Sequence, residues 1–188
     1  RRLPTINVDA TNAQAGDTVI LTGTMGDHGI AVMSQRRGLD FGTDTVSDVA
    51  PLCGLVRRLL EVCPDVHVLR DPTRGGVTTA LCDIAKASRY SIVIEEKTLP
   101  VGDDVAAACD LLGLDPLGVA NEGKAIVICP EPQTERVLGV LHSHPYGRQA
   151  TVIGNVRADR DGDVIVRTTI GGERILIPPA GEQLPRIC

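Results

Sequence analysis

Two kinds of apolar pattern alternate along this chain of 188 residues, and the alternation limits the folds that the chain can adopt. Short apolar runs between turn residues are typical of buried strands, whereas apolar residues at every third or fourth position are typical of helices. The runs that predict strands in the first two thirds lie at residues 18–24, 66–69, 91–96 and 125–129. Helical patterns separate them, so the sequence predicts an α/β or α+β domain in which a mixed sheet is layered with helices.

The predicted helices have recognisable start and stop signals. Ser47 or Asp48 is a good cap for the second helix, Pro64 ends it, and Gly113 ends the fourth. The helical patterns cover residues 30–37, 48–63, 77–85, 105–112 and 131–142.

The last third of the chain is rich in strand patterns. Residues 150–156 and 163–169 both predict strands, and Asp-Arg-Asp-Gly at 159–162 separates them. Such a turn sequence between two strands predicts a hairpin. A last short strand is predicted at residues 173–177.

Composition excludes several classes of protein. Hydrophobic residues make up 43% of the chain but aromatic residues only 2%, so the core consists mainly of Val, Ile, Leu and Ala. The net charge of −5, with no basic run, disfavours a nucleic-acid partner. No apolar stretch approaches the ~20 residues of a membrane span, and no signal-peptide pattern is present.

The cysteines are reduced core residues by pattern, with one exception. None of the six forms a Cys-x-x-Cys pair, which argues against a zinc ribbon or finger. Cys53, Cys63 and Cys109 fall on apolar helical stripes and are predicted to be buried and inert. This usage is typical of a cytoplasmic protein. The exception is Cys188, which ends the sequence Pro-Arg-Ile-Cys after a polar, turn-rich segment.

The strongest internal motif is Arg-Asp-Pro-Thr-Arg-Gly-Gly at residues 70–76. Glycines in the first helical turn let backbone N–H groups approach a ligand, and a helix N-terminus favours an anion. The equally open alternative is a strand-to-helix turn with a good cap. The motif is not a Walker A loop, because the Gly-Lys-Ser/Thr element is absent. The candidate phosphate-binding residues are Arg70, Asp71, Thr73, Arg74, Gly75 and Gly76.

Three further groups of residues are weaker candidates. Asp27 and His28 lie between two glycines before a helix, where His28 can donate to a phosphate or Asp27 can simply cap the helix. Glu122, in Asn-Glu-Gly-Lys at 121–124, is either part of a turn or a general base presented on a loop. His142 and His144 lack evident further ligands, so no metal site is predicted.

Taken together, these motifs resemble those of a known family. Arg-Asp-Pro-Thr-Arg-Gly-Gly-Val at 70–77, Gly-Asp-His-Gly at 26–29, Asn-Glu-Gly-Lys at 121–124 and the ending Pro-Arg-Ile-Cys are similar, in the same order, to those of the hydrogenase maturation family HypE. That family belongs to the aminoimidazole ribonucleotide synthetase-like (PurM) superfamily. The resemblance spans essentially the whole chain.

The resemblance implies ATP-dependent carbamoyl dehydration for [NiFe]-hydrogenase assembly. A carbamoyl group on the Cys188 thiol is phosphorylated by ATP with Mg²⁺ and dehydrated to a thiocyanate, the source of the iron cyanide ligands, with Glu122 as the base. The implied partners are the carbamoyltransferase HypF, the HypC–HypD complex and a second copy in a homodimer. No nucleic-acid or membrane partner is expected.

The resemblance also implies a domain organisation. Residues 1–178 are expected to form the C-terminal domain of the synthetase-like fold and residues 179–188 a flexible tail carrying Cys188. The ATP-binding N-terminal half of the family is expected to be missing, so the chain alone is predicted to be inactive. Two alternatives remain: a small-molecule synthetase or kinase of the same superfamily, such as a selenophosphate synthetase, or a non-catalytic docking domain.

Overall fold

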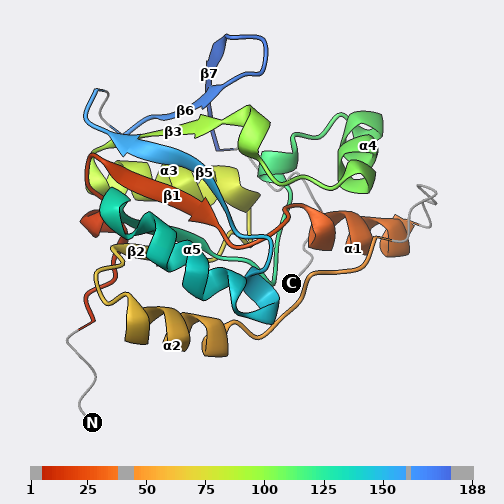
Figure 1. Cartoon of the computed structure of the whole chain (residues 1–188). Helices are drawn as coiled ribbons and strands as arrows, with labels where there is room; N and C mark the ends of the chain where they lie inside the picture. Colours follow the sequence, from red (N-terminus) through yellow and green to blue (C-terminus); the bar gives the residue numbers. More distant parts are fainter. Residues whose placement is uncertain (1–5, 38–44, 160–161, 179–188) are drawn as a thin grey trace.

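The computed structural model describes residues 6–37, 45–159 and 162–178. Within them, a mixed seven-stranded sheet runs in the order β2-β4-β1-β5-β3-β6-β7 (Figure 1). Every neighbouring pair is antiparallel except β3 and β6. The strands are β1 (Asp17–Leu21), β2 (Val68–Arg70), β3 (Ser91–Glu95), β4 (Ile126–Pro130), β5 (Thr151–Arg157), β6 (Val164–Arg167) and β7 (Glu173–Ile175). The predicted mixed sheet layered with helices is therefore confirmed.

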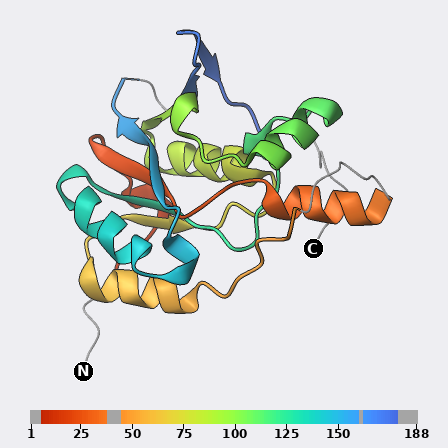
Figure 2. The ribbon, with the colours of Figure 1, turned by 45° about the vertical axis from the view of Figure 1, so that its right-hand side comes forward.

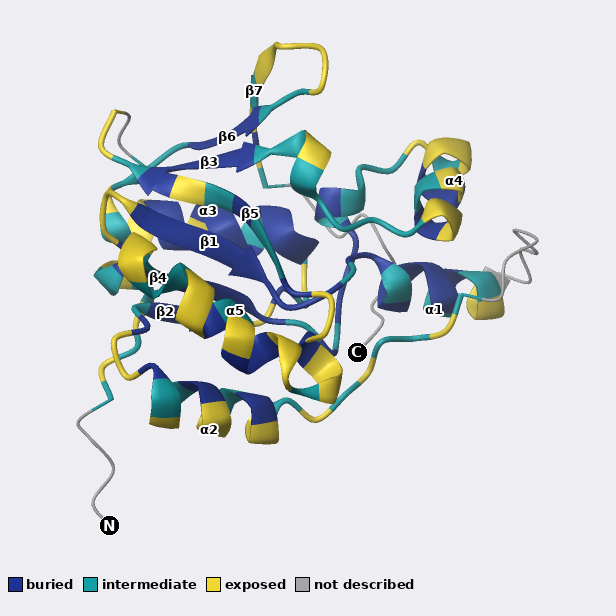
Figure 3. Cartoon of the chain, viewed as in Figure 1, coloured by how far each residue is buried: buried dark blue, intermediate teal, exposed yellow. Residues whose placement is uncertain are grey.

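Helices cover both faces of this sheet. Side chains of neighbouring strand residues point to opposite faces, so β1 sends Val19 and Leu21 toward α3 and Ile20 toward α2 and α5. Figure 2 shows α2 and α5 together on the side of the sheet opposite α3, and Figure 3 shows buried residues between these layers. The helices are α1 (Asp27–Arg37), α2 (Cys53–Val62), α3 (Gly76–Ser88), α4 (Asp103–Leu112) and α5 (Thr134–His142).

A smaller cluster joins α1 to α4 beyond one end of the sheet (Figure 1). Ile30 of α1 packs there against Val105 and Cys109 of α4 and against Val119. Val119 follows the short 3₁₀ helix η3 (Pro116–Gly118). This cluster fixes the start of α1 beside the segment that leads to residues 121–124.

The predicted hairpin of residues 150–156 and 163–169 is wrong, because β3 lies between the two strands. β3 pairs with β5 on one side and with β6 on the other. All of Ser91–Ile94 is buried, and a strand buried on both faces is most stable in the interior of a sheet. The turn pattern at 159–162 predicts only that the chain reverses direction. It does not indicate which strand pairs with residues 151–157 in the sheet.

The predicted start of the second helix is also wrong. α2 begins at Cys53 rather than after Ser47 or Asp48. Pro51 explains the difference, since a proline disfavours helical backbone in the residue before it. Residues 45–50 are consequently free to run as a loop, and Cys53 at the start of α2 is exposed rather than buried.

Candidate functional site

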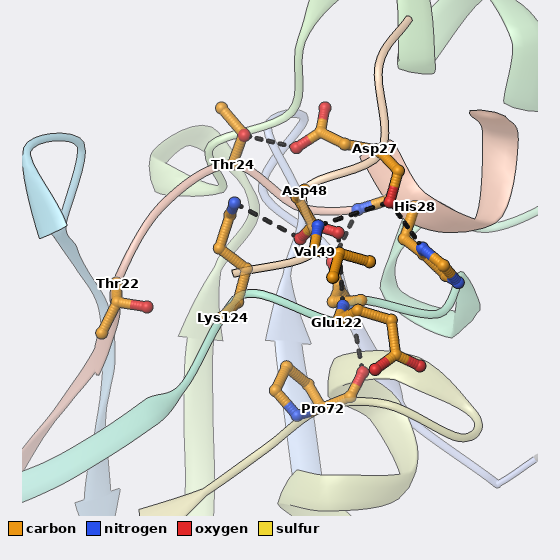
Figure 4. A network of polar contacts seen from close by, with 12 residues as sticks. Thr22, Thr24, Asp27, His28, Asp48, Val49, Pro72, Glu122 and Lys124 are labelled. Carbon is orange, nitrogen blue, oxygen red and sulfur yellow. Dashed lines mark hydrogen bonds and ion pairs between the residues drawn. The ribbon is translucent and has the colours of Figure 1, made fainter. Parts of the chain in front are cut away.

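Three loops with polar motifs meet at the ends of three neighbouring strands of the sheet. The register pairs Leu21 and Arg70 with Ile126, so the ends of β1 and β2 lie beside the start of β4. The loops that leave or enter there are residues 22–26, 71–75 and 119–125 (Figure 4). The structure thus brings together three motifs that are far apart in the sequence.

Asn121 links the three loops through a side chain that is almost fully buried. Its Oδ1 accepts a hydrogen bond from the Gly26 N–H at 2.8 Å. Its Nδ2 donates to the carbonyl oxygens of Pro72 at 3.1 Å and Val119 at 3.0 Å. The Asn121 backbone N–H also donates to the Pro72 carbonyl, at 3.3 Å. Because all these groups are buried, the amide satisfies backbone atoms that would otherwise lack partners.

Glu122 is held through its backbone and leaves its carboxylate available. Its N–H donates to Asp48 Oδ1 at 3.2 Å. Among the described residues, the Glu122 carboxylate has no hydrogen-bond or ion-pair partner. Figure 4 shows this carboxylate on the side of the loop opposite the Lys124 ammonium group. A fixed backbone with an unpaired, half-buried carboxylate is suited to a general base.

Asp48 and Lys124 form a buried ion pair next to Glu122. Lys124 Nζ lies 3.3 Å from Asp48 Oδ2, and the two side chains are only 13% and 3% exposed. The backbone approach is also close, because a Cβ on Gly123 would overlap the Asp48 carbonyl oxygen. The segment 45–50 is thereby attached to the Glu122 loop by charge and by packing.

Asp27 and His28 begin α1 at the rim of this network. Thr24 donates its hydroxyl to Asp27 Oδ2, and His28 Nδ1 lies 2.8 Å from Ser47 Oγ. His28 is 7% exposed, and its buried Nε2 has no partner within the described part of the chain. Asp27 is the first helical residue rather than the residue before the helix.

The motif at 70–76 is shaped by contacts within the protein. Thr73 Oγ1 donates to Asp71 at 3.0 Å, and Arg70 lies 3.7 Å from Asp83 of α3. Gly75 and Gly76 have φ angles of +69° and +61°, and a Cβ on Gly76 would press on the backbone of residues 117–119. Gly76 therefore lets α3 pack against η3, whereas a Cβ on Gly75 would overlap the Thr79 side chain of α3 itself. Arg74 is exposed on this loop.

Burial separates the cysteines into two groups. Burial raises the pKa of Cys63 and Cys82, and raises the pKa of Cys109 and Cys129 to about 11. These four thiols are therefore poor nucleophiles at neutral pH. The predicted burial of Cys63 and Cys109 is confirmed, and that of Cys53 is wrong. Cys188 and the expected tail lie outside the described residues.

The histidines at 142 and 144 have structural contacts. His142 Nε2 lies 2.8 Å from the Ala150 carbonyl oxygen, and His144 Nδ1 accepts from the Tyr146 N–H at 3.3 Å. In the described ranges, no three His, Cys, Asp or Glu side chains are grouped as a metal site. None of the helices in those ranges is long and apolar enough to span a membrane.

Sequence reasoning missed Asp48 as a member of this site and the linking role of Asn121. Either Ser47 or Asp48 was expected to cap a helix, yet Asp48 contacts a residue 74 positions away. No local pattern signals such a partner. Asn121 was visible only as part of a turn motif.

Comparison with known proteins places these features in a family context. Residues 14–167 match the family model described as AIR synthase related protein, C-terminal domain. The carbamoyl dehydratase HypE of Cupriavidus necator is 48% identical over 183 residues, which is 97% of this chain and 52% of that protein. The Escherichia coli K12 HypE is 42% identical over 97% of this chain and 54% of its own length. The chain thus spans about half the length of the curated relatives that it matches.

Solved structures agree with the sequence matches. A crystal structure of the hydrogenase maturation protein HypE superposes with a TM-score of 0.92 at 45% identity, covering 96% of this chain and 58% of the other. HypE in complex with ATP gives 0.91 at 45% identity over 96% and 55%, respectively. The HypE–HypF complex gives 0.88 at 45% identity over 92% and 56%.

Proposed function

Since this chain belongs to the HypE family through an AIR synthase related C-terminal domain, we propose that it is the C-terminal half of an ATP-dependent carbamoyl dehydratase in [NiFe]-hydrogenase maturation. The observation that carries the proposal is the Glu122 loop, where an unpaired carboxylate is held in place by Asn121 and Asp48. It occurs in a chain that is 48% identical to a carbamoyl dehydratase over nearly its whole length.

The proposed nucleophile is the thiol of Cys188. Burial and a raised pKa argue against Cys63, Cys82, Cys109 and Cys129, as described above. Cys53 is exposed but fixed in the first turn of α2, whereas Cys188 ends the Pro-Arg-Ile-Cys sequence that resembles the ending of the HypE family. Cys188 is therefore proposed to carry the carbamoyl group as a thiocarbamate, –S–C(=O)–NH₂.

Dehydration then takes two chemical steps. ATP transfers its γ-phosphoryl group to the carbamoyl oxygen, which releases ADP and a proton and leaves –S–C(–OPO₃²⁻)=NH. Glu122 removes the remaining N–H proton while the C–O bond breaks and phosphate leaves, which gives –S–C≡N. Phosphorylation converts a poor leaving group into a good one. When the base takes the proton, the electron pair of the broken N–H bond forms the new C–N π bond.

Residues on the neighbouring loops are proposed to lie on the phosphate side. They are Asp27, His28, Arg70, Asp71, Thr73, Arg74, Gly75 and Gly76. Arginine side chains and helix N-terminal N–H groups favour phosphate, although Arg70 is also directed toward Asp83. No group of three or more His, Cys, Asp or Glu side chains occurs among the described residues, and we propose that ATP and its Mg²⁺ are held mainly by the N-terminal half.

The partners follow from the family. Because HypE forms a complex with HypF, we propose that the carbamoyltransferase HypF loads Cys188. HypE also binds ATP, and we propose ATP as the phosphoryl donor here. Delivery to HypC–HypD and a homodimer are further parts of the proposal.

The test uses this chain within a protein of its relatives' full length, made by joining it to the N-terminal half of the Cupriavidus necator protein (below, the full-length protein). With carbamoyltransferase, carbamoyl phosphate and ATP, intact mass and peptide mapping should place first a carbamoyl group and then a thiocyanate on Cys188. Cys188→Ala should abolish both, and Cys53→Ala, the matched exposed thiol, should change neither.

The base is tested in the same protein. Glu122→Gln should accept carbamoyl normally but form thiocyanate at least about 100-fold more slowly, since general-base catalysis contributes ~10²–10⁴. Glu131→Gln, an exposed control, should behave like the parent. Label on another cysteine would refute the nucleophile, and normal thiocyanate formation in Glu122→Gln would refute the base.

A further inference from the structure

Asn121 uses its whole side-chain hydrogen-bonding capacity inside the protein. The residue is 1% exposed, its single oxygen accepts from Gly26, and its two N–H groups donate to Pro72 and Val119. A buried amide that links segments 95 and 49 residues away is not needed to turn the chain. It fixes the distance between the loops.

Glu122 follows Asn121 directly, so this linkage also fixes where Glu122 begins. Asn121 attaches the loop to the residues that precede α1 and to Pro72, next to the 71–75 segment. The Glu122 side chain itself has no partner within the described residues. Its place relative to a substrate therefore depends on its backbone, which Asn121 holds on one side and Asp48 on the other.

On the basis of the proposed function, we propose that Asn121 is a positioning residue for the removal of the N–H proton by Glu122. Its contribution belongs to dehydration and not to the loading of Cys188. A displacement of a catalytic group by about 1 Å can cost ~10²-fold in rate. We therefore expect loss of the amide to slow thiocyanate formation by about 100-fold.

The test is a cycle of variants in the full-length protein, measured as single-turnover thiocyanate formation from preloaded Cys188 with saturating ATP. Asn121→Ala should lower the rate about 100-fold and leave the half-saturating ATP concentration and the carbamoyl loading rate within threefold of the parent. In the Glu122→Gln background, Asn121→Ala should cause less than a threefold further loss. Two residues that act on one step do not have additive effects.

A second variant guards against simple unfolding. Asn121→Asp keeps the acceptor for Gly26 but turns carboxylate oxygen toward the carbonyls of Pro72 and Val119, so it should also slow dehydration selectively. Val137→Ala, in the distant α2–α5 layer, should lower stability while leaving the dehydration rate within threefold. It shows whether reduced stability alone affects the rate.

The outcomes separate this inference from the function on which it rests. If Glu122→Gln forms thiocyanate at the parent rate, the proposed base is wrong. If Glu122→Gln is slow but Asn121→Ala is normal, or if their effects are additive, the positioning role is refuted. Equal loss of loading and dehydration, or loss of the fold in both Asn121 variants, would assign Asn121 a purely structural role and also refute it.

Discussion

Substitutions that remove one charge of the buried Asp48–Lys124 ion pair should lower the free energy of unfolding more than any other charge substitution at this site. At the observed 3.3 Å, two unit charges attract by about 5 kcal/mol if the effective dielectric constant is ~20. The cost of removing both charges from water offsets much of that attraction, so the intact pair contributes little to the free energy of unfolding. Removing one partner is different, because it leaves a buried charge uncompensated, at a cost of ~3–5 kcal/mol.

We therefore predict a strongly non-additive double-mutant cycle. Lys124→Met should lower the free energy of unfolding by about 3 kcal/mol, since it leaves the Asp48 carboxylate unpaired. Asp48→Asn keeps an acceptor for the Glu122 N–H, yet it leaves the Lys124 ammonium unpaired and should cost ~2 kcal/mol or more. The double variant should recover at least ~2 kcal/mol relative to the sum of the single effects.

Urea unfolding of the chain at pH 7 is the assay, followed by far-ultraviolet circular dichroism because the sequence has no Trp. The matched control is the exposed ion pair of Arg57 and Glu61, whose side chains are 80% and 47% exposed. Its coupling energy should be below ~0.5 kcal/mol and should vanish at 1 M salt, whereas the buried coupling should persist. A coupling for Asp48 and Lys124 no larger than that of the surface pair would refute the reasoning.

Three further predictions concern packing and the thiols. Gly123→Ala should destabilise the chain by more than ~2 kcal/mol, because the new Cβ overlaps the Asp48 carbonyl. Gly139→Ala is the control: it lies in open space on α5, and the substitution should stabilise the chain by up to ~1 kcal/mol. Equal urea midpoints for the two variants would contradict this prediction. When the native chain is labelled with a bulky thiol reagent at pH 8, Cys53 should react fast. The buried thiols should react only when the chain unfolds; they are Cys63, Cys82, Cys109 and Cys129. Peptide mapping that finds fast label on a buried thiol would be evidence against the fold. Burial raises the pKa of Cys109 and Cys129 from 9.0 to about 11, so the unfolded state loses these protons first as the pH rises. The free energy of unfolding is therefore nearly unaffected below about pH 9 and falls by about 2 kcal/mol per thiol by about pH 11. Urea midpoints from pH 8 to 11 should thus fall less steeply in Cys109→Ala and Cys129→Ala than in the parent, and identical slopes would count against the raised pKa values.

The expectations that rested on local pattern were largely confirmed. Apolar periodicity predicted the strand that became β3 and the helix that became α4, and Gly113 ends that helix in the left-handed conformation. These features depend on the residues within a few positions of one another, which is the information that periodicity and turn residues contain. The motifs at 26–29, 70–76 and 121–124 were likewise visible in the sequence.

Only the tertiary structure decided which residues meet. The turn at 159–162 correctly indicated a chain reversal, but β3 was inserted between the two strands because its apolar run is buried on both faces. Ser47 or Asp48 was predicted to cap a helix that in fact begins later, because Pro51 leaves the preceding segment as a loop. Asp48 instead pairs with Lys124 and accepts a hydrogen bond from the Glu122 N–H. The partners in each case are dozens of residues apart, and their contact depends on the order of strands in the sheet, which no local pattern contains.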